Sequence, residues 1–408
     1  MKREDLFKKY SKHPKHTYEI KETLSAADEI NIAFVYSGRD RGKSFEISAQ
    51  CIADAWYDNK QLGYIRRHDA TIYDVELYFN DKHDFIRDMT DGQYEGITRK
   101  NGRLVFYSEV EKDGIMKKVP GKECGFFFAL SRQGSYKSEQ FPEVYNLIYE
   151  EVLTDDGQFL RAEPEKVLNL YSTVLRNKPR NETHLWLISN LVSAVNPYSK
   201  AWGIMLSRNK PGDIRISKLY LGSYNEKGEE DYYTIAAHYL ENLNDLDKKD
   251  LKKNRIRVKT GVASNKWDEL HLYTTIDLSF MRQFKPQATA IFEHDDMMIQ
   301  CTVLDVPDNI YDVYVQDEDE TVEPIPFSKT TMPVLYFRRK TTPVKPGTRI
   351  YSNNAERFSP YVTKGFKVLC PLDHIIKSLY DRGWSIGADN LTMNDFRQIY
   401  RNLSLVAC

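Results

Sequence analysis

Ser37 to Ser44 form the stretch of this chain whose residue types are best suited to chemistry on phosphates. The stretch reads Ser-Gly-Arg-Asp-Arg-Gly-Lys-Ser. Backbone N–H groups of such a loop, together with the start of a following helix, attract an anion. The lysine can reach the β- and γ-phosphates of a nucleotide, and the last hydroxyl can bind Mg²⁺. The nucleotide-binding candidates are therefore Gly38, Arg39, Asp40, Arg41, Gly42, Lys43 and Ser44.

Ser37 stands where the usual phosphate-loop pattern has its first glycine. A surface turn that contains glycine and solvated charges would have the same composition, so the loop alone leaves both interpretations open. The choice depends on which residues the rest of the chain places near it.

A pair of adjacent carboxylates, Glu150 and Glu151, ends the apolar run that begins at Val144. At the end of a strand, the first acid can hold Mg²⁺, and the second can orient or deprotonate an attacking water. Aspartate is commoner at the first position, but glutamate is also a hard oxygen ligand. A charged pair that merely caps a strand is the alternative.

Ser189 and Asn190 end a second apolar run in the same way, and a neutral amide there can hydrogen-bond a γ-phosphate. Three strand ends in the order phosphate loop, double acid and polar amide favour an ATPase. Arg176, Lys178 and Arg180 follow a helical pattern and are candidates for an arginine finger that acts on a neighbouring subunit's nucleotide. A helix C-terminus attracts cations in any case, so stabilisation of the helix end is the alternative role. The residues alone also leave the choice among these three cations open.

The elements that must position these residues alternate between strand and helix up to about residue 205. Apolar runs predict strands at 30–36, 61–67, 124–130, 144–151 and 185–190, and helical spacing predicts helices at 45–56, 74–89 and 163–175. Asn101-Gly102 predicts a hairpin over 94–107. This alternation predicts an α/β domain with a largely parallel central sheet.

Beyond residue 205 the composition changes. Residues 206–265 are rich in Gly, Pro, Asp and Lys, and Asp231 to Asn254 has the pattern of a charged helix; we interpret this segment as a lid or linker. Residues 266–408 predict a smaller α+β domain, with a hairpin of 288–293 and 297–304, strands at 312–316 and 334–337, and helices at 373–381 and 394–403. The predicted domains are 1–205, 206–265 and 266–408.

Composition sets limits on the class of protein. The chain has 408 residues and a formal net charge of −1, so contact with nucleic acid must come from local basic patches. Its five cysteines are scattered without a CxxC pair, which favours a reducing compartment and argues against a zinc site. No apolar run has the length of a membrane span, and the N-terminus is polar, so we expect an intracellular protein without a membrane partner.

With these residues in place, the chain resembles the DNA-packaging ATPases of small, protein-primed tailed phages, which are ring motors related to large terminases. The resemblance covers residues from about 30 to 200 and fades beyond them to a shared plan. It rests on stretches that occur in the same order: Gly38-Arg39 with Gly42-Lys43-Ser44; Tyr64-Ile65-Arg66-Arg67; Leu130-Ser131 through Ser135, Lys137-Ser138 and Pro142; Ile148-Tyr149-Glu150-Glu151; Val174-Leu175-Arg176-Asn177; and Ser189-Asn190 followed by Val195-Asn196-Pro197-Tyr198.

The resemblance implies a role for each matching residue. Lys43 and Ser44 would bind phosphate and Mg²⁺, Arg39 would be the loop's phosphate-facing arginine, Glu150 the metal-binding acid and Glu151 the catalytic acid. Arg176 would act as the finger across a subunit interface. Lys137 would face DNA in a central pore. The loop's own residues agree with this, because Arg132 and Lys137 among small polar residues can contact phosphates without reading sequence, and a solvated loop tip is the alternative.

The resemblance also implies an assembly and a reaction. We expect ATP and Mg²⁺ as cofactors and a P-loop NTPase domain followed by a lid and a vestigial, RNase H-like nuclease domain. We expect a homopentameric ring that translocates double-stranded DNA into a capsid, in the host cytoplasm and at the portal vertex, with the portal or a structural packaging RNA as partner. The alternatives are a terminase with an active C-terminal nuclease and a nucleotide-gated DNA clamp.

The predicted C-terminal domain carries acids and bases that bear on these alternatives. An active nuclease needs several acids around two metals. The candidate acids Glu293, Asp295, Asp296 and Asp305 have no spacing that singles out a metal cluster. A basic stretch could meet nucleic acid or form a solvated face, and it consists of Lys329, Arg338, Arg339, Lys340 and Lys345.

Overall fold

The computed structural model divides the chain into two compact units, which are described separately below. Residues 1–191 and 197–253 form the first unit, and residues 192–196 and 254–408 form the second. The structure describes residues 1–10, 18–38, 41–112, 114–154, 158–190, 196–204, 206, 209–224, 228–240, 274–294, 297–310, 313–314, 326–342, 344, 348–352, 367–368, 374–382 and 384–406.

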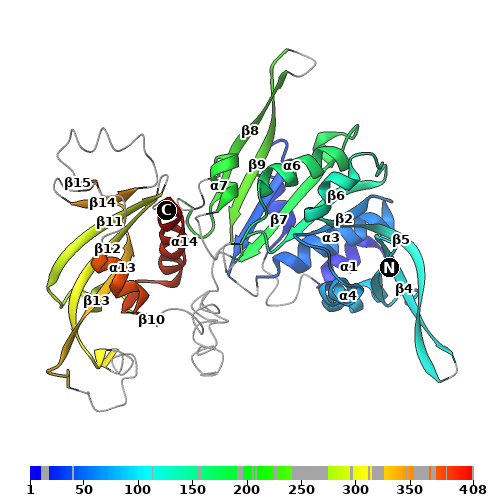
Figure 1. Cartoon of the computed structure of the whole chain (residues 1–408). Helices are drawn as coiled ribbons and strands as arrows, with labels where there is room; N and C mark the ends of the chain where they lie inside the picture. Colours follow the sequence, from blue (N-terminus) through cyan, green and yellow to red (C-terminus); the bar gives the residue numbers. More distant parts are fainter. Residues whose placement is uncertain are drawn as a thin grey trace. The chain divides into compact units, whose positions relative to one another are not determined.

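A twisted sheet forms the centre of the first unit (Figure 1). Within the described residues it has nine strands in the order β3-β4-β5-β2-β6-β7-β1-β9-β8. The pairs from β5 through β2, β6, β7 and β1 to β9 are all parallel, whereas β3, β4 and β8 join the edges as antiparallel strands. The predicted α/β class with a parallel central sheet is therefore confirmed. The strands are β1 (Ile32–Ser37), β2 (Gln61–Arg66), β3 (Gly96–Lys100), β4 (Arg103–Lys112), β5 (Ile115–Ala129), β6 (Val144–Glu150), β7 (His184–Asn190), β8 (Ile214–Tyr224) and β9 (Glu230–Tyr239).

Helices cover both faces of this sheet, which explains why its central strands are apolar without alternation. In β1 all six residues are buried, and successive side chains point to opposite faces. Ala33 and Val35 share a core with α3, whereas the ring of Phe34 meets that of Tyr198 from α7. The helical elements are α1 (Arg3–Tyr10), α2 (Ile20–Leu24), α3 (Lys43–Tyr57), α4 (Ile72–Phe79), η1 (Asn80–Lys82), α5 (His83–Met89), η2 (Leu130–Tyr136), α6 (Glu163–Val174), η3 (Arg180–Glu182) and α7 (Pro197–Trp202).

Two long hairpins, one of β4 and β5 and the other of β8 and β9, extend from the sheet (Figure 1). The first edge contains the predicted Asn101-Gly102 turn between β3 and β4, and both turn residues have positive φ, as a type I′ turn requires. The far ends of β4 and β5 are exposed, and so is most of β8. The hairpin predicted over 94–107 is confirmed as β3 and β4. β5 pairs with β4 on one side and with the parallel strand β2 on the other.

The helix predicted from Asp231 is wrong over the part that the structure describes. Residues Glu230–Tyr239 form β9, which pairs in parallel with β1 and adds a strand to the central sheet. Tyr233, Ala236 and Leu240 are spaced as on one face of a helix, but every residue from Tyr233 to Tyr239 is buried. A strand buried on both faces has no alternation, so periodicity alone cannot distinguish it from a buried helix. Residues 241–254 of the predicted helix lie outside the described residues.

The second unit contains a mixed sheet. Its seven strands within the described residues follow the order β10-β16-β13-β12-β11-β14-β15. β11, β12 and β13 are successive antiparallel strands, and β14 returns parallel to β11. The predicted hairpin is confirmed as β11 and β12. The elements are β10 (Thr274–Thr275), α10 (Leu278–Met281), β11 (Pro286–His294), β12 (Met297–Pro307), β13 (Thr331–Arg339), β14 (Arg349–Ser352), β15 (Lys367–Val368), α13 (His374–Asp381), β16 (Ser385–Gly387) and α14 (Asn390–Val406).

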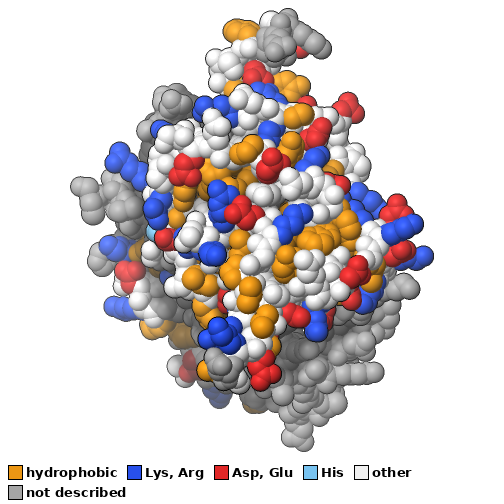
Figure 2. Space-filling view, turned by 90° about the vertical axis from the view of Figure 1, so that its right-hand side faces the viewer, with side chains coloured by type: hydrophobic (Ala, Val, Ile, Leu, Met, Phe, Trp, Pro, Cys, Tyr) orange, Lys and Arg blue, Asp and Glu red, His pale blue; other side chains and the backbone are white. Residues whose placement is uncertain are grey.

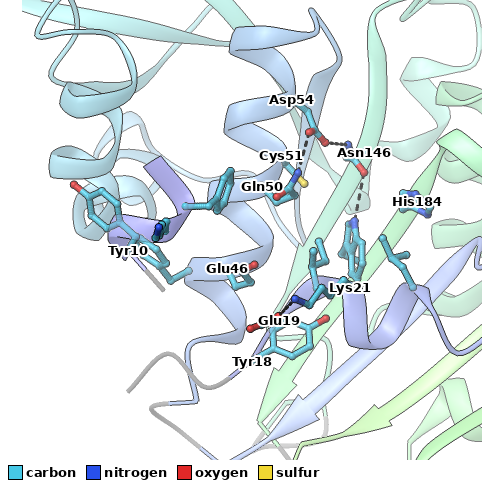
Figure 3. Close-up of a pocket in the computed structure, with 16 residues that line it drawn as sticks. Tyr10, Tyr18, Glu19, Lys21, Glu46, Gln50, Cys51, Asp54, Asn146 and His184 are labelled. Carbon is cyan, nitrogen blue, oxygen red and sulfur yellow. Dashed lines mark hydrogen bonds and ion pairs between the residues drawn. The ribbon is translucent and has the colours of Figure 1, made fainter. Parts of the chain in front are cut away.

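The N-terminal helices α1 and α2 flank α3 and enclose a cavity of about 540 Å³ (Figure 3). Asp54 of α3 joins the layers, since it accepts hydrogen bonds from Gln50 at 3.2 Å and Asn146 at 3.1 Å and pairs with Arg3. Glu46 lines the same cavity, and burial raises its pKa to about 7. The predicted phosphate-loop residues and the acid pair Glu150 and Glu151 do not line this cavity.

The raised pKa of Glu46 predicts a pH-dependent stability. The folded state holds the Glu46 proton more tightly than the unfolded chain does, so this contribution is complete below about pH 4.5 and is lost as the pH rises through about 7. The full shift corresponds to about 3 kcal/mol, and we expect about 1 to 2 kcal/mol because the side chain is partly exposed. Urea unfolding at pH 5 and pH 8 should show this loss in the wild type but not in Glu46→Gln. The exposed Glu4→Gln is the control, and an unchanged loss in Glu46→Gln would refute the assignment.

The surface of the protein carries charges of both signs. On the face shown in Figure 2, basic and acidic side chains lie interspersed among apolar ones, in keeping with the net charge of −1. Within the part of the chain that the structure describes, no helix has the length and apolar character needed to cross a membrane.

Candidate functional site

The candidate phosphate-binding loop has the predicted setting, because it connects the end of β1 to the start of α3. Gly42 caps α3 with φ of 73°, a left-handed conformation that glycine adopts at little cost. Ser37, at the position of the missing glycine, is buried, and its hydroxyl donates to the carbonyl of Gly38 at 2.5 Å. Serine therefore fits this position without a positive φ. Arg39 and Asp40 lie outside the described residues, and Arg41 is partly buried.

Lys43 and Asn190 come together at the ends of adjacent strands. The lysine is 6% exposed, and its Nζ donates to the Asn190 Oδ1 at 3.0 Å and to the Gly38 carbonyl at 3.2 Å. The contact follows from topology, since β1 and β7 are parallel neighbours in which Ser37 lies opposite Asn190. The predicted lysine and the predicted polar amide thus share one site. An anion bound there would meet both the ammonium group and the amide.

Glu150 and Ser44 form the second contact of this site. Glu150 ends β6, which lies next to β7, and its carboxylate hydrogen-bonds the Ser44 hydroxyl at the start of α3. Burial raises the pKa of Glu150, while the Ser44 hydrogen bond and the charges of Lys82 and Lys43 act in the opposite direction. A carboxylate and a hydroxyl side by side are hard oxygen ligands of the kind Mg²⁺ accepts, with waters and phosphate oxygens completing its shell. The residues therefore fit the predicted metal.

Glu151 directly follows Glu150, but its side chain is exposed. It has φ of 54°, which is unusual for a residue other than glycine, and its side chain is 69% exposed. Its carboxylate forms an ion pair with Arg66 at the end of β2, at 3.2 Å. Both acids line a cavity of about 500 Å³, together with Arg66, Arg67, His68, Asp69, Ala70, Asp74, Thr154 and Gln158. An exposed carboxylate beside a cavity is suited to accept a proton from water.

The sequence did not predict which residue fixes the backbone of Glu151, Val152 and Leu153, which we call the acid loop. Arg67 forms a two-point ion pair with Glu163, with both contacts at 2.8 Å, and it also donates to the carbonyl of Val152 at 2.9 Å. Arg67 was predicted only as the second of two arginines at a strand end, and Glu163 only as the start of a helix. Their separation along the chain gives no signal, because only the fold brings them together.

The structure distinguishes the three candidate finger cations. Arg180 forms a two-point ion pair with Asp231, at 2.5 and 2.8 Å, and Lys178 donates to the carbonyls of Phe141 and Val174 at 2.8 and 2.9 Å. These two cations therefore hold the first unit together. Arg176 is exposed just beyond α6, where it is accessible to a neighbouring molecule.

The predicted DNA-facing loop begins as η2. Tyr136 anchors it, because its ring packs on Phe128 and its hydroxyl accepts from the Ala129 N–H at 3.0 Å. Lys137 is exposed, and Arg132 is 61% exposed while pairing with Asp69 at 3.4 Å. Both cations are thus exposed on or next to η2, and exposed Lys and Arg side chains can contact a phosphate backbone.

Of the four acids considered for a nuclease, Glu293 and Asp305 lie within the described residues. Glu293 is buried on β11, and Asp305 accepts a hydrogen bond from Gln287. Asp295 and Asp296 lie outside the described residues, and so does Lys345 of the basic stretch. Among the residues that the structure describes, no group of three or more His, Cys, Asp or Glu side chains is arranged to hold a metal ion. Arg339 pairs with the buried Asp395, and Arg338 donates to Gln300 at 3.0 Å.

Comparison with known proteins finds similar sequences for the N-terminal part of the chain. Residues 15–214 match the family model of the podovirus DNA encapsidation protein, Gp16. The DNA packaging proteins of Bacillus phages PZA and phi29 are each 30% identical to the chain over 179 residues, which are 43% of this chain and 48% of the relative. The chain thus spans about half the length of the curated relatives it matches. The resemblance predicted from the motifs is confirmed over this segment.

Comparison with solved structures finds chains from phage DNA packaging motors. The crystal structure of the N-terminal domain of the DNA packaging ATPase from bacteriophage phi29 is 26% identical, with a TM-score of 0.40, over 54% of this chain and 95% of that one. A chain of the phi29 viral genome packaging motor assembly is 16% identical, with a TM-score of 0.45, over 95% of this chain and 99% of that one.

Proposed function

We propose, from the match of residues 15–214 to the podovirus DNA encapsidation family, that this protein is the ATPase of a viral genome-packaging motor. It hydrolyses ATP to ADP and phosphate and uses the energy to move double-stranded DNA into a preformed capsid. The relatives named DNA packaging proteins support the biological role, and the arrangement of the site supports the chemistry.

One observation carries the proposal. Lys43 and Ser44 at the start of α3 contact Asn190 and Glu150, which end the neighbouring strands β7 and β6. Phosphate-binding, metal-binding and polar groups therefore meet at the carboxyl edge of a parallel sheet, where open α/β sheets bind ligands. A structural turn would not need these four residue types at one place.

Each residue has a role in the proposed reaction. Lys43 and the loop amides hold the β- and γ-phosphates, and Ser44 and Glu150 hold Mg²⁺, which supplies charge neutralisation when bound. Glu151 orients the attacking water and takes its proton, which requires the carboxylate to exchange Arg66 for water. Asn190 hydrogen-bonds the γ-phosphate, and Arg176 of one subunit reaches the nucleotide of the next.

The proposed assembly follows the same family. A homopentameric ring places Lys137 and Arg132 towards DNA in its centre, and the portal or a packaging RNA connects the ring to the capsid. Phosphate contacts by exposed cations do not read sequence, which suits a motor that must move any part of the genome. The second unit serves as the vestigial, RNase H-like nuclease domain that the resemblance implies, and it contacts nucleic acid without cutting it.

The binding half of the proposal predicts the effect of Lys43→Ala. Losing a buried, charge-assisted contact to phosphate, of about 1.5 to 3 kcal/mol, should weaken binding of a fluorescent ATP analogue with Mg²⁺ by about 10- to 150-fold. Lys21→Ala is the control, since Lys21 is exposed and pairs with Glu19. Equal binding by Lys43→Ala and the wild type would refute a phosphate role for this loop.

A further inference from the structure

Glu163 is a buried carboxylate that the proposed chemistry does not use. It is the first residue of α6 and has 0% exposure. Its oxygens accept from Arg67 twice at 2.8 Å, from Tyr149 at 2.9 Å, and from Tyr198 and the Leu160 N–H at 2.8 Å each. Burial alone would raise the pKa of Glu163, but Arg67 and the other donors hold it below its ordinary value. The carboxylate is therefore ionised and fully hydrogen-bonded.

Arg67 links this carboxylate to the acid loop. Its Nη2 donates to the Val152 carbonyl at 2.9 Å, and its Nη1 approaches the Glu151 carbonyl at 3.4 Å. The guanidinium also lies over the rings of Tyr149 and Phe159, at 5.6 and 5.5 Å. The planar fork of an arginine can hold a carboxylate and neighbouring carbonyls at once, which a lysine cannot do.

The acid loop is also hydrogen-bonded to β7. The Val152 N–H donates to the Ile188 carbonyl at 3.3 Å, and the Leu153 N–H donates to the Ser189 hydroxyl at 3.1 Å. Between these contacts Glu151 keeps its φ of 54°, a conformation that persists only when its surroundings hold it. The backbone at Glu151 is thus fixed from β7 and from Arg67 together.

We propose that Arg67 and Glu163 form a positioning pair for the catalytic acid. Glu163 orients Arg67, Arg67 fixes the carbonyls of Glu151 and Val152, and this backbone geometry places the Glu151 carboxylate at the cavity beside Glu150. Neither residue touches the reacting atoms. The inference rests on the proposed ATPase function, because it assigns these residues to the step in which Glu151 activates water.

The pair should affect turnover and not nucleotide binding. Glu163→Gln removes the charge that orients Arg67, and Arg67→Lys keeps a charge but loses the fork. We expect each variant of the full-length protein to lower kcat for ATP at least about 10-fold, since a displacement of about 1 Å at a catalytic group can cost about 100-fold. KM and the affinity for a fluorescent ATP analogue should stay within about threefold of the wild type.

Asp395→Asn is the matched control. Asp395 is a buried carboxylate that pairs with an arginine, Arg339, in the second unit. Asp395→Asn should leave kcat for ATP unchanged. Thermal unfolding shows whether each variant is folded. If Glu163→Gln fails to fold, Arg67→Lys and Tyr149→Phe, which removes only the 2.9 Å hydrogen bond to Glu163, carry the test.

A double variant shows whether the pair acts through Glu151. In Glu151→Gln, the further change Glu163→Gln should have no effect on the residual turnover, because the group that it positions is already inactive. Equal kcat in Glu163→Gln, Arg67→Lys and the wild type would overturn the inference, and so would a multiplied loss in the double variant. A wild-type protein that binds ATP analogue but never hydrolyses ATP would instead overturn the proposed function.

Discussion

Glu151→Gln should bind ATP as the wild type does but hydrolyse it about 10² to 10⁴ times more slowly, the range expected for loss of a general base. Glutamine keeps the size and hydrogen-bonding capacity of the side chain but cannot take a proton from water. The side chain is exposed beside the cavity and pairs with Arg66, so the change disturbs no buried packing. Phosphate release with Mg²⁺ and double-stranded DNA measures turnover, and a fluorescent ATP analogue measures binding.

Glu165→Gln provides the matched control for this experiment. It makes the same chemical change at an exposed position of α6 and should leave turnover unchanged. If Glu151→Gln hydrolysed ATP at the wild-type rate, Glu151 would not be the catalytic acid and the water would need another base.

Arg176→Ala should lower turnover by about 10³ to 10⁵, the range for loss of an arginine finger. The expectation rests on the difference between the three cations: Lys178 and Arg180 are held by contacts within the first unit, whereas Arg176 is exposed beyond α6. Arg87→Ala, at an exposed arginine of α5, is the control. Phosphate release again measures the effect.

Mixing experiments show whether Arg176 acts on a neighbouring subunit. Subunits with Arg176→Ala keep an intact acid, and subunits with Glu151→Gln keep an intact arginine. A mixture of the two inactive proteins should regain part of the wild-type turnover, because some sites then combine an intact acid with a neighbour's intact arginine. Absence of recovery at every mixing ratio would count against action between subunits.

The sequence predicted the parts of the fold whose signals are local. The turn at Asn101-Gly102 and the strand–loop–helix from Ile32 to Tyr57 depend on neighbouring residues, and the structure confirms them. β9 was predicted as a helix because its apolar residues satisfy both patterns, and only its pairing with β1 decides between them. Whether residues 206–265 act as a lid stays a prediction.

The candidate site also contains residues that the sequence could predict and residues that only the fold brings together. Lys43, Ser44, Glu150 and Asn190 were predicted because strand ends in a parallel sheet converge, and the structure brings them into contact. The link between Arg67 and Glu163 could not be predicted, since an arginine at a strand end and a glutamate in the first turn of a helix are each common. The resemblance had already assigned the finger to Arg176, but the contacts that hold Lys178 and Arg180 within the first unit could not be predicted from the sequence.

ATP hydrolysis by the full-length protein with double-stranded DNA is the most direct test of the central claim. The account predicts Mg²⁺-dependent phosphate release that rises when double-stranded DNA is added and is lost in Lys43→Ala. Nucleotide binding with a single cleavage event and no further turnover would indicate a DNA clamp instead of a motor. If the assembled protein hydrolysed no ATP with DNA and capsid present, the packaging-ATPase account would be contradicted.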